Sequence, residues 1–456
     1  MPDSAERSAP RVPTRSRSPL LVAGAVAVAL PGVVMSVAGL SVSPPLDALL
    51  YGLAIVGAAF LLSWAAEAAQ VDISAGLAIA LLALVAVLPE YAVDFVFTIQ
   101  GGNAYQLHGP TCLPPGSTDQ SPCGLALANM TGANRILVGI GWALVVLLAA
   151  VRLRRDSSRG RDSRGDGGTT HRPGHATRVT LSRTDSVPLA FLLLATVYSL
   201  TLPLRVSITL VDLVVLVGIF IGYSVRVARA PAEEPDLIGP SAWVGEKAAG
   251  PRRAWYIGLF VVAAAVILLC AEHFADSLVE TGTELGVSQF FLVQWVAPFA
   301  SEAPELLVAG LYAWRLKTTD ALATLVSSKV NQWTLLVGTL PLVFALAAGS
   351  LHGLPIDVEQ REELLLTATQ SLFAVALLVT LSITVSGALA LVGLFALQFV
   401  LAAVLSGPAQ DLELLIISGI YVVLAVGLFV WQRRSLGRLL RDGLRTPYVE
   451  LTREHQ

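Results

Sequence analysis

Long apolar blocks alternate with short polar or charged breaks along the whole chain. Each block is long enough, at 1.5 Å per residue, to cross a hydrocarbon core of about 30 Å as a helix. The blocks do not alternate with the period of two that a transmembrane β-barrel requires. The pattern predicts twelve membrane-spanning helices, at residues 20–41, 46–68, 72–99, 126–151, 187–204, 207–227, 255–278, 287–313, 319–349, 364–386, 388–406 and 412–431.

Composition supports the interpretation of the chain as an all-α, polytopic membrane protein. Of 456 residues, 55% are hydrophobic and 14% are charged, whereas about a quarter of a soluble protein is charged. A soluble globular enzyme is therefore excluded.

Basic residues in short loops predict the orientation, because loops rich in Lys and Arg stay in the cytoplasm. Counting spans from an inside N-terminus places the arginine-rich segments 152–186, 226–253, 315–317 and 433–441 inside. The acidic segments 280–284 and 357–363 then fall outside. We therefore expect a multi-pass protein of the cell inner membrane with a cytoplasmic N-terminal tail (1–19) and C-terminal tail (432–456).

The segments between spans carry two further predictions. Segment 152–186, rich in Arg, Ser, Gly and Asp, reads as a disordered cytoplasmic linker, and 228–254 as a second cytoplasmic linker. Cys112 and Cys123 lie in an outside loop where a disulfide is possible, and the sequence leaves the pairing open.

An internal repeat relates the two halves of the chain. Glu90 in LALVAVLPEYAVDF and Glu305 in WVAPFASEAPELLVAG each follow a proline within apolar sequence. By the orientation count these two spans run in opposite directions. The repeats, 46–227 and 255–406, are therefore inverted, with about five spans each and one extra span at either end (20–41 and 412–431). Inverted repeats are typical of secondary transporters whose substrate site lies where the repeats meet.

The prolines and carboxylates predict a cation site. Pro89 and Pro304 lack an N–H, so they leave the carbonyls of Val85 and Ala300 without helical partners, which favours broken helices lining a cavity. Buried carboxylates need partners in a membrane, and a cluster of them suits Ca²⁺. The candidate ligands are Glu90, Asp94, Glu302 and Glu305.

Two structural readings stay open beside the cation site. The acids can instead pair with Lys329 and Arg135 to hold helices together. Likewise, the polar string that follows each acidic span can serve as interhelical hydrogen bonding rather than cation ligation; it comprises Asn129, Thr131, Asn134, Thr324, Ser327, Ser328, Asn331 and Gln332.

These residues resemble the two inverted motifs of the calcium/cation antiporter superfamily, the sodium/calcium exchangers and their relatives. The matching strings are VAVLPE (85–90) with ANMTGAN (128–134), and ASEAPE (300–305) with ATLVSSK (323–329). The resemblance implies that Glu90 and Glu305 are ion-binding glutamates and that Asn129 is a polar ligand. Thr324 takes the place of that ligand in the second repeat, and Ser301 matches a hydroxyl ligand.

Several positions depart from the family pattern. Ala86 and Val87 carry no hydroxyl group, Glu302 stands where Ser is expected, and Lys329 stands where the last Asn is expected. An ammonium at position 329 can fill one cation position permanently or deprotonate during the cycle. The extra carboxylate favours proton coupling.

The resulting functional expectation is a secondary active antiporter that exchanges Ca²⁺ for H⁺ or Na⁺ by alternating access. The alternatives are a Na⁺/H⁺ antiporter in which Lys329 replaces one bound cation, an intramembrane enzyme, and a non-transporting sensor. An enzyme is disfavoured because strings such as H-E-x-x-H are absent. We expect inorganic cations and the lipid bilayer as partners, with no cofactor, no nucleic acid and no protein partner indicated.

Overall fold

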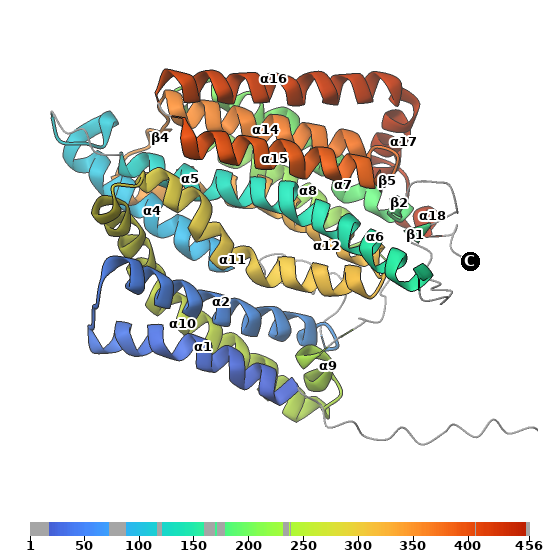
Figure 1. Cartoon of the computed structure of the whole chain (residues 1–456), viewed down its shortest axis with the longest axis horizontal. Helices are drawn as coiled ribbons and strands as arrows, with labels where there is room; N and C mark the ends of the chain where they lie inside the picture. Colours follow the sequence, from blue (N-terminus) through green and yellow to red (C-terminus); the bar gives the residue numbers. More distant parts are fainter. Residues whose placement is uncertain are drawn as a thin grey trace, which may run out of the picture.

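Helices lying side by side along one common direction make up almost the whole chain (Figure 1). The computed structural model describes residues 18–72, 88–115, 121–158, 169–170, 178–230, 237, 239–405 and 407–452. The prediction of an all-α membrane protein is confirmed.

The first half of the chain contains the following helices: α1 (Ser18–Ala38), α2 (Pro44–Ala69), α4 (Leu88–His108), α5 (Pro122–Ile136), α6 (Ala143–Ser158), α7 (Ser186–Ser199) and α8 (Leu210–Val227). The second half contains α9 (Pro240–Gly245), α10 (Ala249–Leu285), α11 (Gln289–Trp314), α12 (Thr318–Asn331), α13 (Val337–Ala348), α14 (Val358–Leu378), α15 (Val385–Val404), α16 (Pro408–Trp431), α17 (Arg433–Leu444) and α18 (Tyr448–Thr452). Short 3₁₀ turns lie at Gly109–Thr111, Arg183–Asp185 and Leu202–Leu204.

In the described part of the chain, nine helical segments are long and apolar enough to cross a membrane. Together with α4, α11 and α14 they correspond to the twelve predicted spans. Carboxylates explain why these three helices are less apolar, since α4 carries Glu90 and Asp94, α11 carries Glu302 and Glu305, and α14 carries Glu363. Residues 73–87, predicted as the start of the third span, lie outside the described residues, and so does the Val85 carbonyl.

The two halves share one order of elements, including an unusual local feature. A π-helical segment, η2 (Leu137–Trp142), joins α5 to α6, and another, η5 (Gln332–Leu336), joins α12 to α13. The helices that lead into these π-segments, α5 and α12, directly follow the helices that carry the Pro–Glu pairs, α4 and α11. Because π-segments are rare and are frequent at functional sites, their repetition marks the same place in both halves.

Short strands at the two ends of the bundle show how the halves are related. In the first half β2 (Arg178–Thr180) precedes α7 and β3 (Ser207–Ile208) precedes α8; in the second half β4 (Leu354–Pro355) precedes α14 and β5 (Ser382–Thr384) precedes α15. The strand β2 pairs with β5, and β3 pairs with β4. This exchange of partners is what a two-fold axis between inverted repeats produces.

Three segments expected to be linkers or tails contain regular structure. β1 (Thr169–Thr170) and β2 form a sheet with β5, so the prediction of a disordered linker is wrong for these residues. The helix α9 and the start of α10 lie within the predicted linker 228–254, and α17 and α18 lie within the predicted C-terminal tail. These helices and strands are mostly short, and the composition of a long segment does not reveal them.

One boundary prediction is also wrong. α14 begins at Val358 rather than 364, because Asp357 and Gln360 form a capping box at its N-terminus. Residues 359–363, predicted in an outside loop, are therefore helical. α11 runs without a break from Gln289 to Trp314, so its prolines do not end the helix.

Cys112 and Cys123 form a disulfide, which answers the question that the sequence left open.

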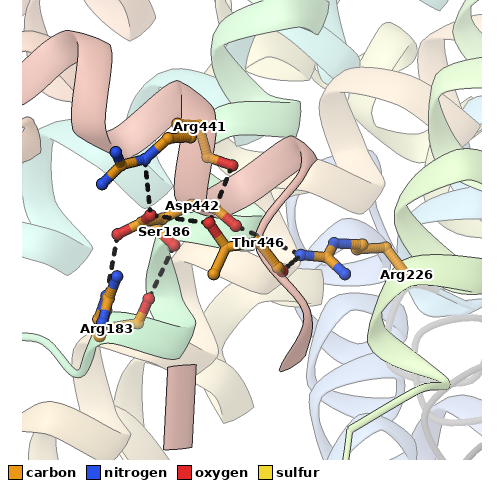
Figure 2. Close-up of polar contacts among 6 residues, drawn as sticks. All are labelled: Arg183, Ser186, Arg226, Arg441, Asp442 and Thr446. Atoms are coloured by element: carbon orange, nitrogen blue, oxygen red, sulfur yellow. Dashed lines mark hydrogen bonds and ion pairs between the residues drawn. The ribbon is translucent and has the colours of Figure 1, made fainter. Parts of the chain in front are cut away.

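The C-terminal α17 docks on the start of α7 through the polar contacts in Figure 2. Arg183 Nε donates to Asp442 Oδ2 at 2.9 Å, and Thr446 Oγ1 donates to Asp442 Oδ1 at 2.9 Å (Figure 2). Arg226 of α8 donates to the backbone carbonyls of Asp442, Gly443 and Thr446. Asp442 thus joins three elements at one end of the bundle.

We expect Asp442→Asn to lower the free energy of unfolding by about 1 kcal/mol at neutral pH. Burial acts to raise the pKa of Asp442, but hydrogen bonds from Arg183 and Thr446 and the charges of Arg183 and Arg441 hold it below its usual value. A carboxylate of this kind stabilises the fold above its unfolded pKa, and the stabilisation is lost as pH falls through the folded pKa. Thermal unfolding from neutral to acid pH should therefore show a gap between wild type and variant that closes on acidification. A gap independent of pH would contradict this role for the carboxylate.

Candidate functional site

Four carboxyl groups, three of them on buried residues, lie on the two helices that carry the Pro–Glu pairs. On α4, Glu90 and Asp94 are one turn apart, with 1% and 0% of each residue exposed. On α11, Glu302 is 3% exposed and Glu305 is half-buried. Glu90 interacts electrostatically with the other three, which places all four acids in one neighbourhood.

Each acidic helix receives one amide from the helix that follows it. Asn129 Nδ2 of α5 donates to Asp94 Oδ1 at 2.7 Å, and Gln332 Nε2 of η5 donates to Glu302 Oε1 at 2.6 Å. Each half thus contains one such contact, made at positions that do not correspond between the two repeats. Gln332 belongs to the polar string that the sequence singled out, but it was not among the predicted ligands. Within the part of the chain that the structure describes, Thr324, which the motif alignment places opposite Asn129, makes no such contact with Glu302.

Glycine at position 132 lets α5 and α11 approach closely. A Cβ placed there would lie 1.7 Å from the backbone oxygen of Gln294 on α11. No side chain fits in that space. Asn129, three residues earlier on α5, is thereby held between the two acidic helices.

Several oxygens of the site accept no hydrogen bond. Among the described residues, both oxygens of Glu90 and one oxygen each of Asp94, Glu302 and Glu305 lack a hydrogen-bond donor. The groups that interact with Glu90 are instead carboxyl groups and Lys329. Because buried polar oxygens are normally satisfied, these oxygens are available to a cation or a proton.

Lys329 lies completely buried between the repeats. Its Nζ donates to the side-chain oxygen of Asn134 at 2.6 Å and to the Asn134 backbone oxygen at 3.0 Å. The ammonium also lies 4.7 Å from the centroid of the Trp333 ring, and it interacts electrostatically with Glu90 and Glu302. In the described part of the chain, none of the four acids forms an ion pair within 4.0 Å with Lys329 or Arg135, as the structural alternative requires. Arg135 pairs with Glu363 instead.

The two predicted hydroxyl ligands donate to their own helices. Ser301 Oγ, on a buried residue, donates to the Pro298 backbone oxygen at 3.2 Å. Thr324 is exposed, and its Oγ1 donates to the Asp320 backbone oxygen at 2.8 Å. Ser328, one turn beyond Thr324, interacts with Glu305 instead.

The acids are neighbours without converging on one point. Among the described residues, no group of three or more His, Cys, Asp and Glu side chains lies close enough together to hold a metal ion. The convergence of the four carboxylates around one bound cation therefore stays a prediction. Of the other three acids, Glu302 interacts most strongly with Glu90, and the amides of Asn129 and Gln332 donate to Asp94 and Glu302.

Comparisons with known proteins assign the chain to a family. The sequence profile of the sodium/calcium exchanger protein family matches residues 46–228 and 255–404. A crystal structure described as the H⁺/Ca²⁺ exchanger CAX is 35% identical in sequence, with a TM-score of 0.82, over 95% of this chain and 99% of that chain. The structure of native YfkE, at 15% identity and a TM-score of 0.50 over 90% of this chain and 99% of that chain, shows a similar fold. The comparison with curated proteins finds no match. The chain belongs to the sodium/calcium exchanger family.

Proposed function

We propose that this chain is a H⁺/Ca²⁺ antiporter of the cell inner membrane, with its cation site formed by Glu90, Asp94, Glu302 and Glu305. Membership of an exchanger family makes the chain a cation transporter and not an enzyme. The observation that carries the proposal is the charge balance of the site, where three buried carboxyl groups and the half-buried Glu305 share one buried ammonium group, which interacts with Glu90 and Glu302.

That charge balance requires an exchangeable positive charge. If every acid were ionised, the four carboxylates and Lys329 would leave an excess of three negative charges in a water-poor interior. Such an excess is too costly to persist. Ca²⁺ neutralises two charges by binding carboxylate oxygens, and protons neutralise the same groups when Ca²⁺ leaves. One set of acids that must hold either Ca²⁺ or protons is the chemical requirement for exchange.

The arrangement of helices supports alternating access. α1, α2 and α10 lie together along one side of the bundle, and α2 and α10 contact α11 (Figure 1). The acids on α4 and α11 are thus near the boundary between this helix group and the remaining helices. Rocking of one group against the other would open the site first to one side and then to the other.

Proton coupling is preferred to sodium coupling for two reasons. The relative that is 35% identical is described as a H⁺/Ca²⁺ exchanger. In addition, Lys329 already supplies a fixed positive charge beside Glu90 and Glu302, so a further monovalent metal ion is not needed there. We include cytoplasmic termini in this proposal because the sequence segments next to both termini are rich in arginine.

Wild-type protein in liposomes should take up Ca²⁺ when the lumen is more acidic than the outside solution. The lumen should become more alkaline as Ca²⁺ enters, because protons leave in exchange. A Na⁺ gradient at equal pH on both sides should drive no uptake above that of empty liposomes. Uptake driven by Na⁺ alone would replace the proton with sodium in this proposal, and Na⁺ and H⁺ flux without Ca²⁺ flux would favour the monovalent antiporter.

A further inference from the structure

A second buried charged cluster lies outside the cation site, where α5, α14 and α16 meet. Arg135 of α5 lies with Nη2 2.7 Å from Glu363 Oε2 of α14, and Glu413 of α16 interacts electrostatically with both. The exposed fractions are 0% for Arg135, 2% for Glu363 and 5% for Glu413. All three side chains are therefore largely removed from solvent.

The cluster lacks one positive charge. Two carboxyl groups face one guanidinium group, and among the described residues neither oxygen of Glu413 has a hydrogen-bond donor. A buried carboxylate without a donor or a partner is costly. The described residues contain no group of three metal-binding side chains there. The simplest ligand that completes the cluster is one proton on the carboxyl pair.

The neighbouring helices supply few other charges that could do so. α14 presents Glu363 and, towards its start, Glu362 and Glu359. α5 presents Arg135, whose other neighbour is the Trp295 ring of α11, 4.8 Å away. α15 has no titratable residue. Arg361, also near the start of α14, interacts with Glu362 and donates to the Pro203 backbone oxygen. The other groups are Tyr421 and Asp411 of α16 itself, and Gln294 of α11, which hydrogen-bonds to Glu363.

This cluster connects one surface of the protein with the cation site. Asp411 is exposed and Glu359 and Glu362 are half-buried where α14 and α16 begin, so acids become progressively more buried towards Glu413 and Glu363. Further inward, Arg135 directly follows Asn134, the residue that holds Lys329. Chains of intramembrane acids of this kind are typical of proton relays.

We propose that Glu363 and Glu413, with Arg135, form a proton-binding site that is separate from the Ca²⁺ site and exchanges protons with the side of the membrane where α14 and α16 begin. Its part in transport rests on the proposed H⁺/Ca²⁺ exchange, whereas its binding of a proton does not. Arg135 keeps one carboxylate ionised, and the second carboxyl group takes up and releases the proton. Protonation changes the charge beside Asn134 and Lys329. The pH on the side of the membrane where α14 and α16 begin therefore affects the cation site.

The test uses the full chain in liposomes with three variants. Glu413→Gln keeps the shape of the side chain and removes the titration, Glu413→Asp restores a carboxyl group, and Glu272→Gln removes an exposed carboxyl group of α10 as a matched control. Infrared difference spectra after a pH jump report the carbonyl stretch of protonated carboxyl groups. In parallel, Ca²⁺ affinity and Ca²⁺ uptake driven by a pH gradient are measured for each protein.

We expect one protonated-carboxyl band to disappear in Glu413→Gln and to remain in Glu413→Asp and Glu272→Gln. We also expect Glu413→Gln to slow pH-driven Ca²⁺ uptake by about tenfold, the usual size of a coupling between two sites, while its Ca²⁺ affinity stays within about twofold of wild type. An unchanged band in Glu413→Gln would overturn the proton site. A lost band with unchanged uptake would overturn its role in transport. If wild type shows no H⁺/Ca²⁺ exchange, the proposed function fails, while the infrared result still decides whether Glu413 binds a proton.

Discussion

Glu90→Gln is expected to abolish Ca²⁺ transport while leaving the protein at least as stable as wild type. Glu90 is buried, its oxygens have no hydrogen-bond donor among the described residues, and other carboxyl groups surround it. Replacing it with a neutral amide removes repulsion in the empty site and removes a charged ligand from the occupied one. Loss of one such ligand corresponds to about 3 kcal/mol, or about 100-fold in Ca²⁺ affinity. Uptake of Ca²⁺ into liposomes and the thermal unfolding temperature without Ca²⁺ measure the two effects.

The matched control for this variant is Glu272→Gln, which makes the same chemical change at an exposed position of α10. It should transport Ca²⁺ at the wild-type rate. Glu90→Gln that transports normally would exclude Glu90 from the cation site. Glu90→Gln that unfolds at a clearly lower temperature would instead make Glu90 a structural residue.

Lys329→Asn is expected to make the protein depend on Na⁺. The ammonium group lies beside Glu90 and Glu302 and donates two hydrogen bonds to Asn134. Removing one partner from a buried cluster of charges destabilises by about 3–5 kcal/mol. Asparagine supplies an oxygen ligand in place of the fixed charge, so a bound Na⁺ can restore the balance. In Na⁺-free buffer the thermal unfolding temperature should fall, and added Na⁺ should recover it and stimulate Ca²⁺ transport.

Lys247→Asn is the matched control. Lys247 also lies over a tryptophan ring, with its Nζ 3.8 Å from the centroid of Trp243. It lies near the end of α9, however, and is far in sequence from the acids of the site. Its variant should show no response to Na⁺. If Lys329→Asn behaves in the same way, Lys329 does not occupy a cation position.

The sequence was sufficient to predict the bundle because hydrophobic length and basic loops are strong, independent signals. The inverted repeat was also visible, since Pro89–Glu90 and Pro304–Glu305 are unusual in apolar sequence. The exchange of strands between β2–β5 and β3–β4 was not predictable, because strands of two or three residues leave no periodic pattern.

Within the candidate site, residue type was predictable and pairing was not. The motif alignment assigned Thr324 to the place of Asn129, yet Gln332, eight positions later, provides the second amide. Gln332 is the first residue of the π-segment that lies beyond α12, so an alignment of the short motif that contains Thr324 does not reach it. Likewise, the need for glycine at position 132 arises from the approach of Gln294 on a distant helix.

Charges at helix ends were the other source of error. Glu363 was assigned to an acidic loop because its neighbours are charged, but the Asp357–Gln360 capping box brings it into α14 and buries it against Arg135. The capping residues were present in the sequence at the expected spacing. Recognising them would have moved the start of the span and brought Glu363 to attention.

The central claim is that one set of acids holds either protons or Ca²⁺, and counting protons released on Ca²⁺ binding tests it most directly. Calorimetric titration of the purified protein with Ca²⁺, in buffers of different ionisation enthalpy, gives that number. We predict release of protons at neutral pH that disappears in Glu90→Gln together with Ca²⁺ binding. Tight Ca²⁺ binding with no proton release at any pH would contradict the account.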